Sequence, residues 1–268
     1  MINVKLIIIY SLISVLGLSL SACNTSEDSK ESAQETQVND SFLTTAVDSS
    51  EESSVSSDSD SVMPVTDSNL SVESLLDKAE QHHLIFMREE EKLARDVYIS
   101  LYGMWSNSPI FMNIGEGSEQ THTDIIRDKL EEFNLADPNP STNVLPSSIG
   151  VFTGELYGSY FADKYQSLIN RGSQSELEAL YVGAFIEELD MHDIVECPDI
   201  IVETDNGIND CGLDYTNEEA LINAYSTLLD GSKNHLKAFV GRIESIIGEG
   251  NYEAQILSQD EINEILGR

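Results

Sequence analysis

Four long segments of the chain place apolar residues at the spacing of an α-helix, and they limit the possible fold more than any other feature. They cover residues 72–102, 119–133, 175–195 and 216–247, and a shorter helix is expected over 154–170. Three prolines in residues 137–150 end the second long segment, so a long connection leads to the third. No stretch alternates apolar and polar residues convincingly, as a strand would. The sequence therefore predicts an all-α protein.

The order of these segments predicts how the helices are connected. Short links join the helices of each pair, and one long crossover joins the pairs, which is the connectivity of a ferritin-like four-helix bundle. We expect this domain over residues 74–250, followed by a short amphipathic tail over 251–268. Residues 103–117 are expected to form a loop, with Ser118 as the N-cap of the second long helix.

Carboxylates and imidazoles occur on all four long helices. Glu119 and His122 are three residues apart, so both side chains lie on one helical face and can reach one ion. Glu91 interrupts an otherwise apolar stripe on the first helix, and His235 lies midway along the fourth. Bundles that bind two iron or manganese ions use such ligands from four helices, pointing inward. The expected metal ligands are Glu91, Glu119, His122, Glu187 and His235.

Several features of the predicted site stay open. Glu187 and Glu188 lie about 100° apart on a helix, and the sequence does not decide which faces inward. Ser232 stands three residues before His235, where a dinuclear site has a second Glu. Asp190, Asp193 or a water can replace that ligand, or the site holds one ion or none. Residues expected around the ligands are Tyr98, Glu188, Asp190 and Ser232.

The N-terminal part of the chain is expected to direct export. Residues 1–22 have a lysine, an apolar run and then small residues, as a secretory signal does. The sequence around Cys23 resembles a bacterial lipobox, which implies cleavage before Cys23 and lipid attachment to its sulfur. Residues 23–73 are rich in Ser, Asp and Glu, so we expect a disordered tether. The predicted location is the cell envelope, with the membrane as a partner through the lipid.

The net charge and the cysteines indicate which partners and which compartment suit the chain. A formal net charge of −34 excludes nucleic-acid binding, which needs basic surface. Cys197 and Cys211 are expected to form a disulfide, because an exported chain meets an oxidising compartment. The acidic insertion over 196–214 lacks the spacing of an EF-hand, so a solvated loop is favoured over a calcium site.

Five ordered motifs resemble the family called domain of unknown function 2202, of the ferritin-like superfamily. They are EEEKLARDVY at 89–98, SEQTH at 118–122, GVF at 150–152, IEELD at 186–190 and GSKNHL at 231–236. The resemblance covers residues 81–240 and implies a ferritin-like bundle without implying a particular reaction. Ser232 at the expected Glu position resembles the family's own pattern, so the di-iron chemistry of the superfamily carries over only in part.

Three functions follow from these features. The first is a metalloenzyme on the cell surface, an oxidase, peroxidase or ferroxidase. The second is a non-catalytic binding or structural module that keeps a relict polar core. The third is metal storage or delivery without turnover. A homodimer is compatible with each of them.

Overall fold

The computed structural model describes residues 75–140, 148–203 and 207–268, which belong to one compact unit, Thr66–Arg268. The expected signal sequence, the lipidation site Cys23 and the whole tether lie outside the described residues, which begin at Leu75. The described part is helical and contains no strand, as the sequence predicts. None of its helices has the length and hydropathy needed to cross a membrane.

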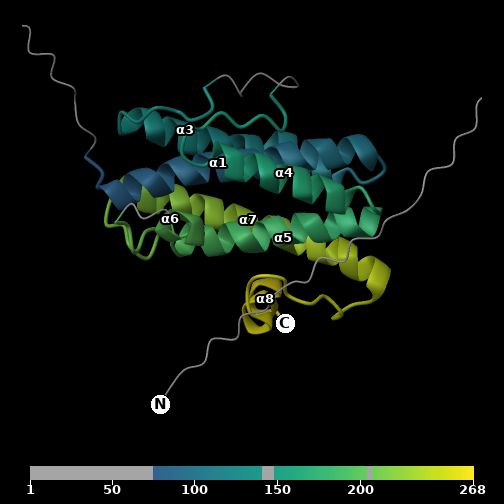
Figure 1. The fold of residues 1–268 in the computed structure, drawn as a ribbon. Coiled ribbons are helices and arrows are strands. Elements are labelled where there is room, and N and C mark those ends of the chain that lie inside the picture. The colour runs from purple at the N-terminus through teal and green to yellow at the C-terminus, as the bar shows by residue number, and fades with distance from the viewer. Residues whose placement is uncertain (1–74, 141–147, 204–206) are drawn as a thin grey trace, which may run out of the picture. The chain divides into compact units, whose positions relative to one another are not determined.

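The helices follow one another along the chain. They are α1 Lys78–Met104, α2 Ile110–Met112, the π-helix η1 Asn113–Glu119, α3 Gln120–Glu132, α4 Gly158–Gly172, α5 Glu176–Val195, α6 Asp199–Glu203, α7 Glu219–Ile247 and α8 Gln259–Leu266. The longest connections lie between α3 and α4 and between α6 and α7. Figure 1 shows α1, α3 and α4 above α5 and α7, with α8 below them. α1 packs on α3, α5 packs extensively on α7, and α4 bridges α1 and α5. The core between the layers includes Phe86, Tyr98, Ile126, Val182 and Phe239, all fully buried.

The first helix begins later than the sequence pattern predicts. Residues 75–77 are not helical, and α1 starts at Lys78. Asp77 accepts a hydrogen bond from the Glu80 backbone at 2.9 Å, and Glu80 accepts one from the Asp77 backbone at 3.0 Å. This capping box satisfies two backbone donors that the first helical turn leaves unpaired, and it fixes the start of the helix.

The prediction of a loop over residues 103–117 is wrong for the second half of that range. α2 and η1 together make residues 110–119 helical, and Ser118 lies inside η1 instead of capping α3. Glycines at 115 and 117 favoured a loop in the sequence, but Gly115 has a packing role. A Cβ there would lie 3.0 Å from the Tyr98 Cβ, so glycine lets η1 lie against α1.

The acidic insertion between α5 and α7 is partly ordered by a covalent bond. Cys197 and Cys211 form the expected disulfide. The short helix α6 lies inside this loop, where the sequence predicted only irregular structure. α7 then begins at Glu219 with Glu218 as its N-cap, slightly after the expected start at Thr216. The expected amphipathic tail contains α8, which has its own capping box from Ser258 and Glu261.

Candidate metal centre

The five expected ligands come from four helices and meet in the interior of the described unit. Glu91 lies on α1, Glu119 and His122 lie at the junction of η1 and α3, Glu187 lies on α5, and His235 lies on α7. All five side chains are buried. Three carboxyl groups and two imidazoles are rarely buried together without strong compensation, because removing charge from water is costly.

His122 forms the first of two neighbouring groups. Its Nδ1 lies 3.3 Å from Oε2 of Glu91 and 3.3 Å from Oε2 of Glu119. One ligand atom from each residue lies within 4.8 Å of the other two. A single cation between these atoms would therefore contact two carboxylate oxygens and one imidazole nitrogen.

His235 forms the second group with the other oxygen of the same glutamate. Its Nδ1 lies 2.8 Å from Oε1 of Glu119 and 3.3 Å from Oε2 of Glu187. The imidazole rings of His122 and His235 are stacked, with centroids 5.5 Å apart. Glu119 thus offers one oxygen to each histidine and belongs to both groups, as a bridging carboxylate would.

The hydrogen bonding of these side chains fits a cation better than an ion-pair network. Nδ1 of each histidine lies close to oxygens of two carboxylates but is not aligned for a hydrogen bond with either of them. Oε1 of Glu91 is also buried without a partner. Buried polar atoms are nearly always paired, and each unpaired one costs about 1–3 kcal/mol. Carboxylate and imidazole donors suit iron or manganese, so the residues present fit a metal ion at each group.

Ser118 holds the second histidine in place. Its hydroxyl lies 2.7 Å from Nε2 of His235, so the ring is oriented with Nδ1 toward the carboxylates. Such contacts behind a ligand fix its orientation. A capping role was predicted for Ser118 instead, because the π-helix that places it toward α7 leaves no signal in the hydrophobic spacing.

Tyr98 contacts one of the ligands, and Ser232 contacts a further buried carboxylate. The Tyr98 hydroxyl donates to Oε1 of Glu187 at 2.5 Å. Ser232 donates to the carboxylate of Asp190, which is buried and keeps its Oδ1 unpaired. Ser232, at the position where a second Glu was expected, thereby orients a carboxylate from α5.

Glu188 does not lie beside the ligands, contrary to the sequence-based expectation. Its carboxylate accepts hydrogen bonds from the Tyr252 hydroxyl at 2.6 Å and from the backbone of Gln255, Ile256 and Leu257 at 2.8, 2.6 and 3.0 Å. Glu187 is therefore the inward-facing residue of the pair. Glu188 fastens the segment before α8 to α5.

Replacing Glu188 with alanine is expected to release that segment without disturbing the metal centre. The lost hydrogen bonds should lower the free energy of unfolding by about 1–3 kcal/mol, and amide exchange at residues 255–257 should accelerate by about tenfold or more. Hydrogen exchange followed by mass spectrometry measures this, with the exposed Glu253→Ala as a control. Unchanged exchange in Glu188→Ala would contradict the assignment.

The electrostatics of the centre couple the carboxylates to the imidazoles. Burial raises the pKa of Glu91 and of Glu187 to about 7. Burial opposes charge on Glu119 too, but the two imidazoles outweigh it and hold its pKa below the usual range. Burial would lower the histidine pKa values, yet the carboxylates raise them to about 12 for His122 and about 10 for His235. Positive charge is thus strongly favoured among these side chains, whether carried by protons or by metal ions.

Gly231 of α7 makes room for the first histidine, a role that its place in the motif GSKNHL does not reveal. A Cβ at this position would lie 2.4 Å from Cε1 and Nε2 of His122, far inside van der Waals contact. Glycine in the interior of a helix costs about 1 kcal/mol relative to alanine, so its presence needs such a reason. A glycine four residues before a candidate ligand histidine is the signal that could have revealed it.

Together, the fold and the site define an all-helical protein with two adjoining buried carboxylate–histidine groups that could each hold a metal ion. The profile of the family described as "Uncharacterized protein domain (DUF2202)" matches residues 80–268, and the chain belongs to this family. The uncharacterized protein MJ0754 of Methanocaldococcus jannaschii is 40% identical over 191 residues, covering 71% of this chain and 88% of the relative. The crystal structure of the hypothetical protein MJ0754 from Methanococcus jannaschii is similar with a TM-score of 0.58 and 38% identity, over 72% of this chain and 94% of that one.

Proposed function

We propose that this chain is a ferritin-like protein that binds two iron or manganese ions and uses them for redox chemistry with oxygen or a peroxide. The observation that carries the proposal is the position of Glu119 between two histidines whose Nδ1 atoms have no hydrogen-bond partner. A relict polar core would be expected to align these atoms for hydrogen bonds with the carboxylates, because such bonds would compensate their burial.

Each ligand has a distinct role in this proposal. Glu119 would bridge the ions, His122 and Glu91 would hold one, and His235 and Glu187 would hold the other. When bound, iron or manganese would supply Lewis acidity and one-electron redox chemistry. The protein keeps the ligands buried and oriented, with Ser118 contacting His235 and Tyr98 donating to Glu187. Asp190, held by Ser232, supplies a further buried carboxylate where the second Glu is missing.

The arrangement of the helices supports a ferritin-like bundle as the scaffold. The ligands come from α1, α3, α5 and α7, which pack as the pairs α1 with α3 and α5 with α7. The long connection between the pairs carries α4. Ligands projecting inward from four helices, with one long crossover, are typical of the dinuclear carboxylate proteins.

We further propose that the protein works in the cell envelope, anchored through a lipid on Cys23. The lipobox-like sequence before Cys23 is the main support. The disulfide between Cys197 and Cys211 fits this location, because disulfides persist in oxidising compartments. The acidic tether would keep the domain away from anionic lipid headgroups.

Metal analysis followed by turnover measurements tests the function. Protein purified without chelator is expected to contain close to two iron or manganese ions per chain and to consume oxygen or hydrogen peroxide when given an electron donor. Iron bound without consumption of either oxidant would assign the site to storage or delivery. Substoichiometric iron, manganese and zinc would favour the non-catalytic module.

A further inference from the structure

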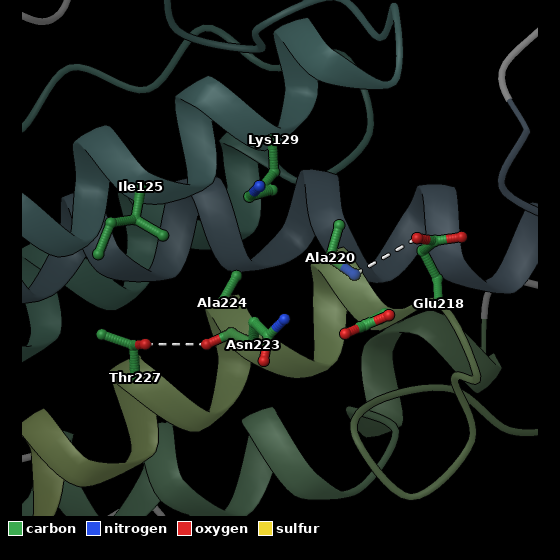
Figure 2. A pocket seen from close by; sticks show the side chains of 8 residues that line it. Ile125, Lys129, Glu218, Ala220, Asn223, Ala224 and Thr227 are labelled. Carbon is green, nitrogen blue, oxygen red and sulfur yellow. Dashed lines mark hydrogen bonds between the residues drawn. The ribbon is translucent and has the colours of Figure 1, made fainter.

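A groove separates α3 from α7 along the side of the bundle. It has a volume of about 570 Å³ and is bordered by Ile125 and Lys129 of α3 and by the first three turns of α7. Figure 2 shows these two helices facing each other across the groove, with α1 behind them. The groove is possible because α3 and α7 pack on each other far less than α5 packs on α7.

Small residues keep the α7 side of this groove open and lead to the metal centre. Ala220, Ala224 and Thr227 line it, and Gly231 follows at the same helical spacing. The Thr227 hydroxyl is turned back to the Asn223 carbonyl at 2.8 Å, as Figure 2 shows. Gly231 has no side chain on this face of α7, and the His122 ring occupies the space where a Cβ would lie.

The two histidines are the least buried of the five candidate ligands. The side chains of His122 and His235 are 6% and 9% exposed, whereas those of Glu91, Glu119 and Glu187 are 1%, 3% and 2% exposed. His122 is thus more than nine-tenths buried, with Nδ1 unpaired and with Nε2 directed at Gly231. Nε2 makes no hydrogen bond with any described residue. The lining of the groove ends at Thr227, and the His122 ring lies against Gly231, one helical turn further along the same face of α7.

The outer end of the groove is negatively charged. Glu218 and Glu219 lie there, and Glu218 uses one carboxylate oxygen to cap α7 through the Ala220 backbone at 3.3 Å. These carboxylates counter the positive end of the α7 dipole. The charge of Lys129 is offset by Glu132, whose Oε2 lies 2.5 Å from its Nζ. The net charge at this end favours cations, in a chain with a formal net charge of −34.

We propose that the α3–α7 groove is the route by which a divalent transition-metal cation enters the centre. Glu218 and Glu219 concentrate the cation at the outer end, Ala220, Ala224 and Thr227 leave the path open, and His122 is the first ligand that the cation meets. This inference rests on the proposed metal binding, but it concerns the rate of loading and not its extent. A blocked route slows entry and exit equally and leaves the affinity unchanged.

Filling the groove at Thr227 tests the route. Thr227 is exposed, so Thr227→Phe is tolerated by the helix, and Ser226→Phe is a matched control on an exposed neighbour outside the groove. Stopped-flow absorbance with Co²⁺ and the metal-free full chain is expected to show association and dissociation slowed by about tenfold in Thr227→Phe, the factor produced by about 1.4 kcal/mol of added barrier. Ser226→Phe should load at the wild-type rate, and all three proteins should share one stoichiometry and one Kd.

The acidic end is tested separately with the double variant Glu218→Gln/Glu219→Gln. Its association rate should fall by about tenfold at low salt, and the difference from wild type should shrink as salt is added. The exposed Glu249→Gln is the control for a loss of charge elsewhere. Wild-type loading rates in Thr227→Phe would overturn the route even if Co²⁺ binds. A wild-type chain that binds no Co²⁺ at equilibrium would overturn both the route and the proposed function.

Discussion

Replacing Glu119 with glutamine is expected to abolish binding of both metal ions at once. Glu119 is the only residue shared by the two candidate groups, with Oε2 in the first and Oε1 in the second. Removing its charge weakens both sites, and the loss in affinity should exceed the 10–100-fold that changes around metal ligands typically cause. Mass spectrometry of the metal content after dialysis should give about two ions per chain for wild type and close to none for Glu119→Gln.

The other two carboxylates provide matched controls for this prediction. Glu91→Gln should remove only the ion beside His122, and Glu187→Gln should remove only the ion beside His235, because each belongs to one group. Added metal should raise the melting temperature of wild type, and this rise should vanish in Glu119→Gln, since a ligand stabilises only the fold that binds it. Equal metal content in all three variants and wild type would contradict a bridging role for Glu119.

Replacing Gly231 with alanine is expected to have the second largest effect on the centre. The new Cβ would lie 2.4 Å from Cε1 and Nε2 of His122, so the imidazole must move away from its group. Displacing a ligand by about 1 Å is enough to disrupt such a site, and we expect the affinity for the ion beside His122 to fall by about 100-fold or more. Isothermal titration calorimetry with Mn²⁺ should resolve the loss of one site.

This effect is separable from a change in stability. Alanine is the better helix former by about 1 kcal/mol, which offsets part of the roughly 1–3 kcal/mol that overpacking against His122 costs, so the metal-free Gly231→Ala protein should remain folded at the temperature of the titration. Gly241 lies on the same helix with open space around its missing Cβ, so Gly241→Ala should gain helix stability and keep both ions. Two intact sites in Gly231→Ala would show that His122 does not need its observed position.

Periodicity and residue spacing were enough to predict the all-helical fold and the residues that meet in its interior. Glu119 and His122 share a helical face whatever the surrounding fold, and a carboxylate such as Glu91 within an apolar stripe must point inward with it. The sequence could not choose between Glu187 and Glu188, because both are buried. Glu187 faces His235, whereas Glu188 binds a segment more than 60 residues further along the chain.

The features that the sequence missed depend on tertiary contacts. The π-helix of residues 113–119 leaves no pattern of its own, yet it turns Ser118 toward His235. Glycine usually disfavours a helix, but Gly115 and Gly231 each allow a close contact. Gly115 lets η1 approach α1, and Gly231 lets the His122 ring approach α7. Ser232 seemed to weaken the site, and its contact with Asp190 became visible only when α5 and α7 were placed together.

Anomalous X-ray diffraction from crystals of the Mn²⁺-loaded protein, collected on both sides of the manganese edge, shows directly whether Glu119 lies between two metal ions. Two manganese peaks are expected, one beside Nδ1 of His122 and one beside Nδ1 of His235, with Glu119 contributing one oxygen to each. Bonds of about 2.0–2.3 Å to oxygen and nitrogen would be expected for such ligands. Absence of manganese from the centre, with both Nδ1 atoms hydrogen-bonded to the carboxylates, would contradict that position of Glu119.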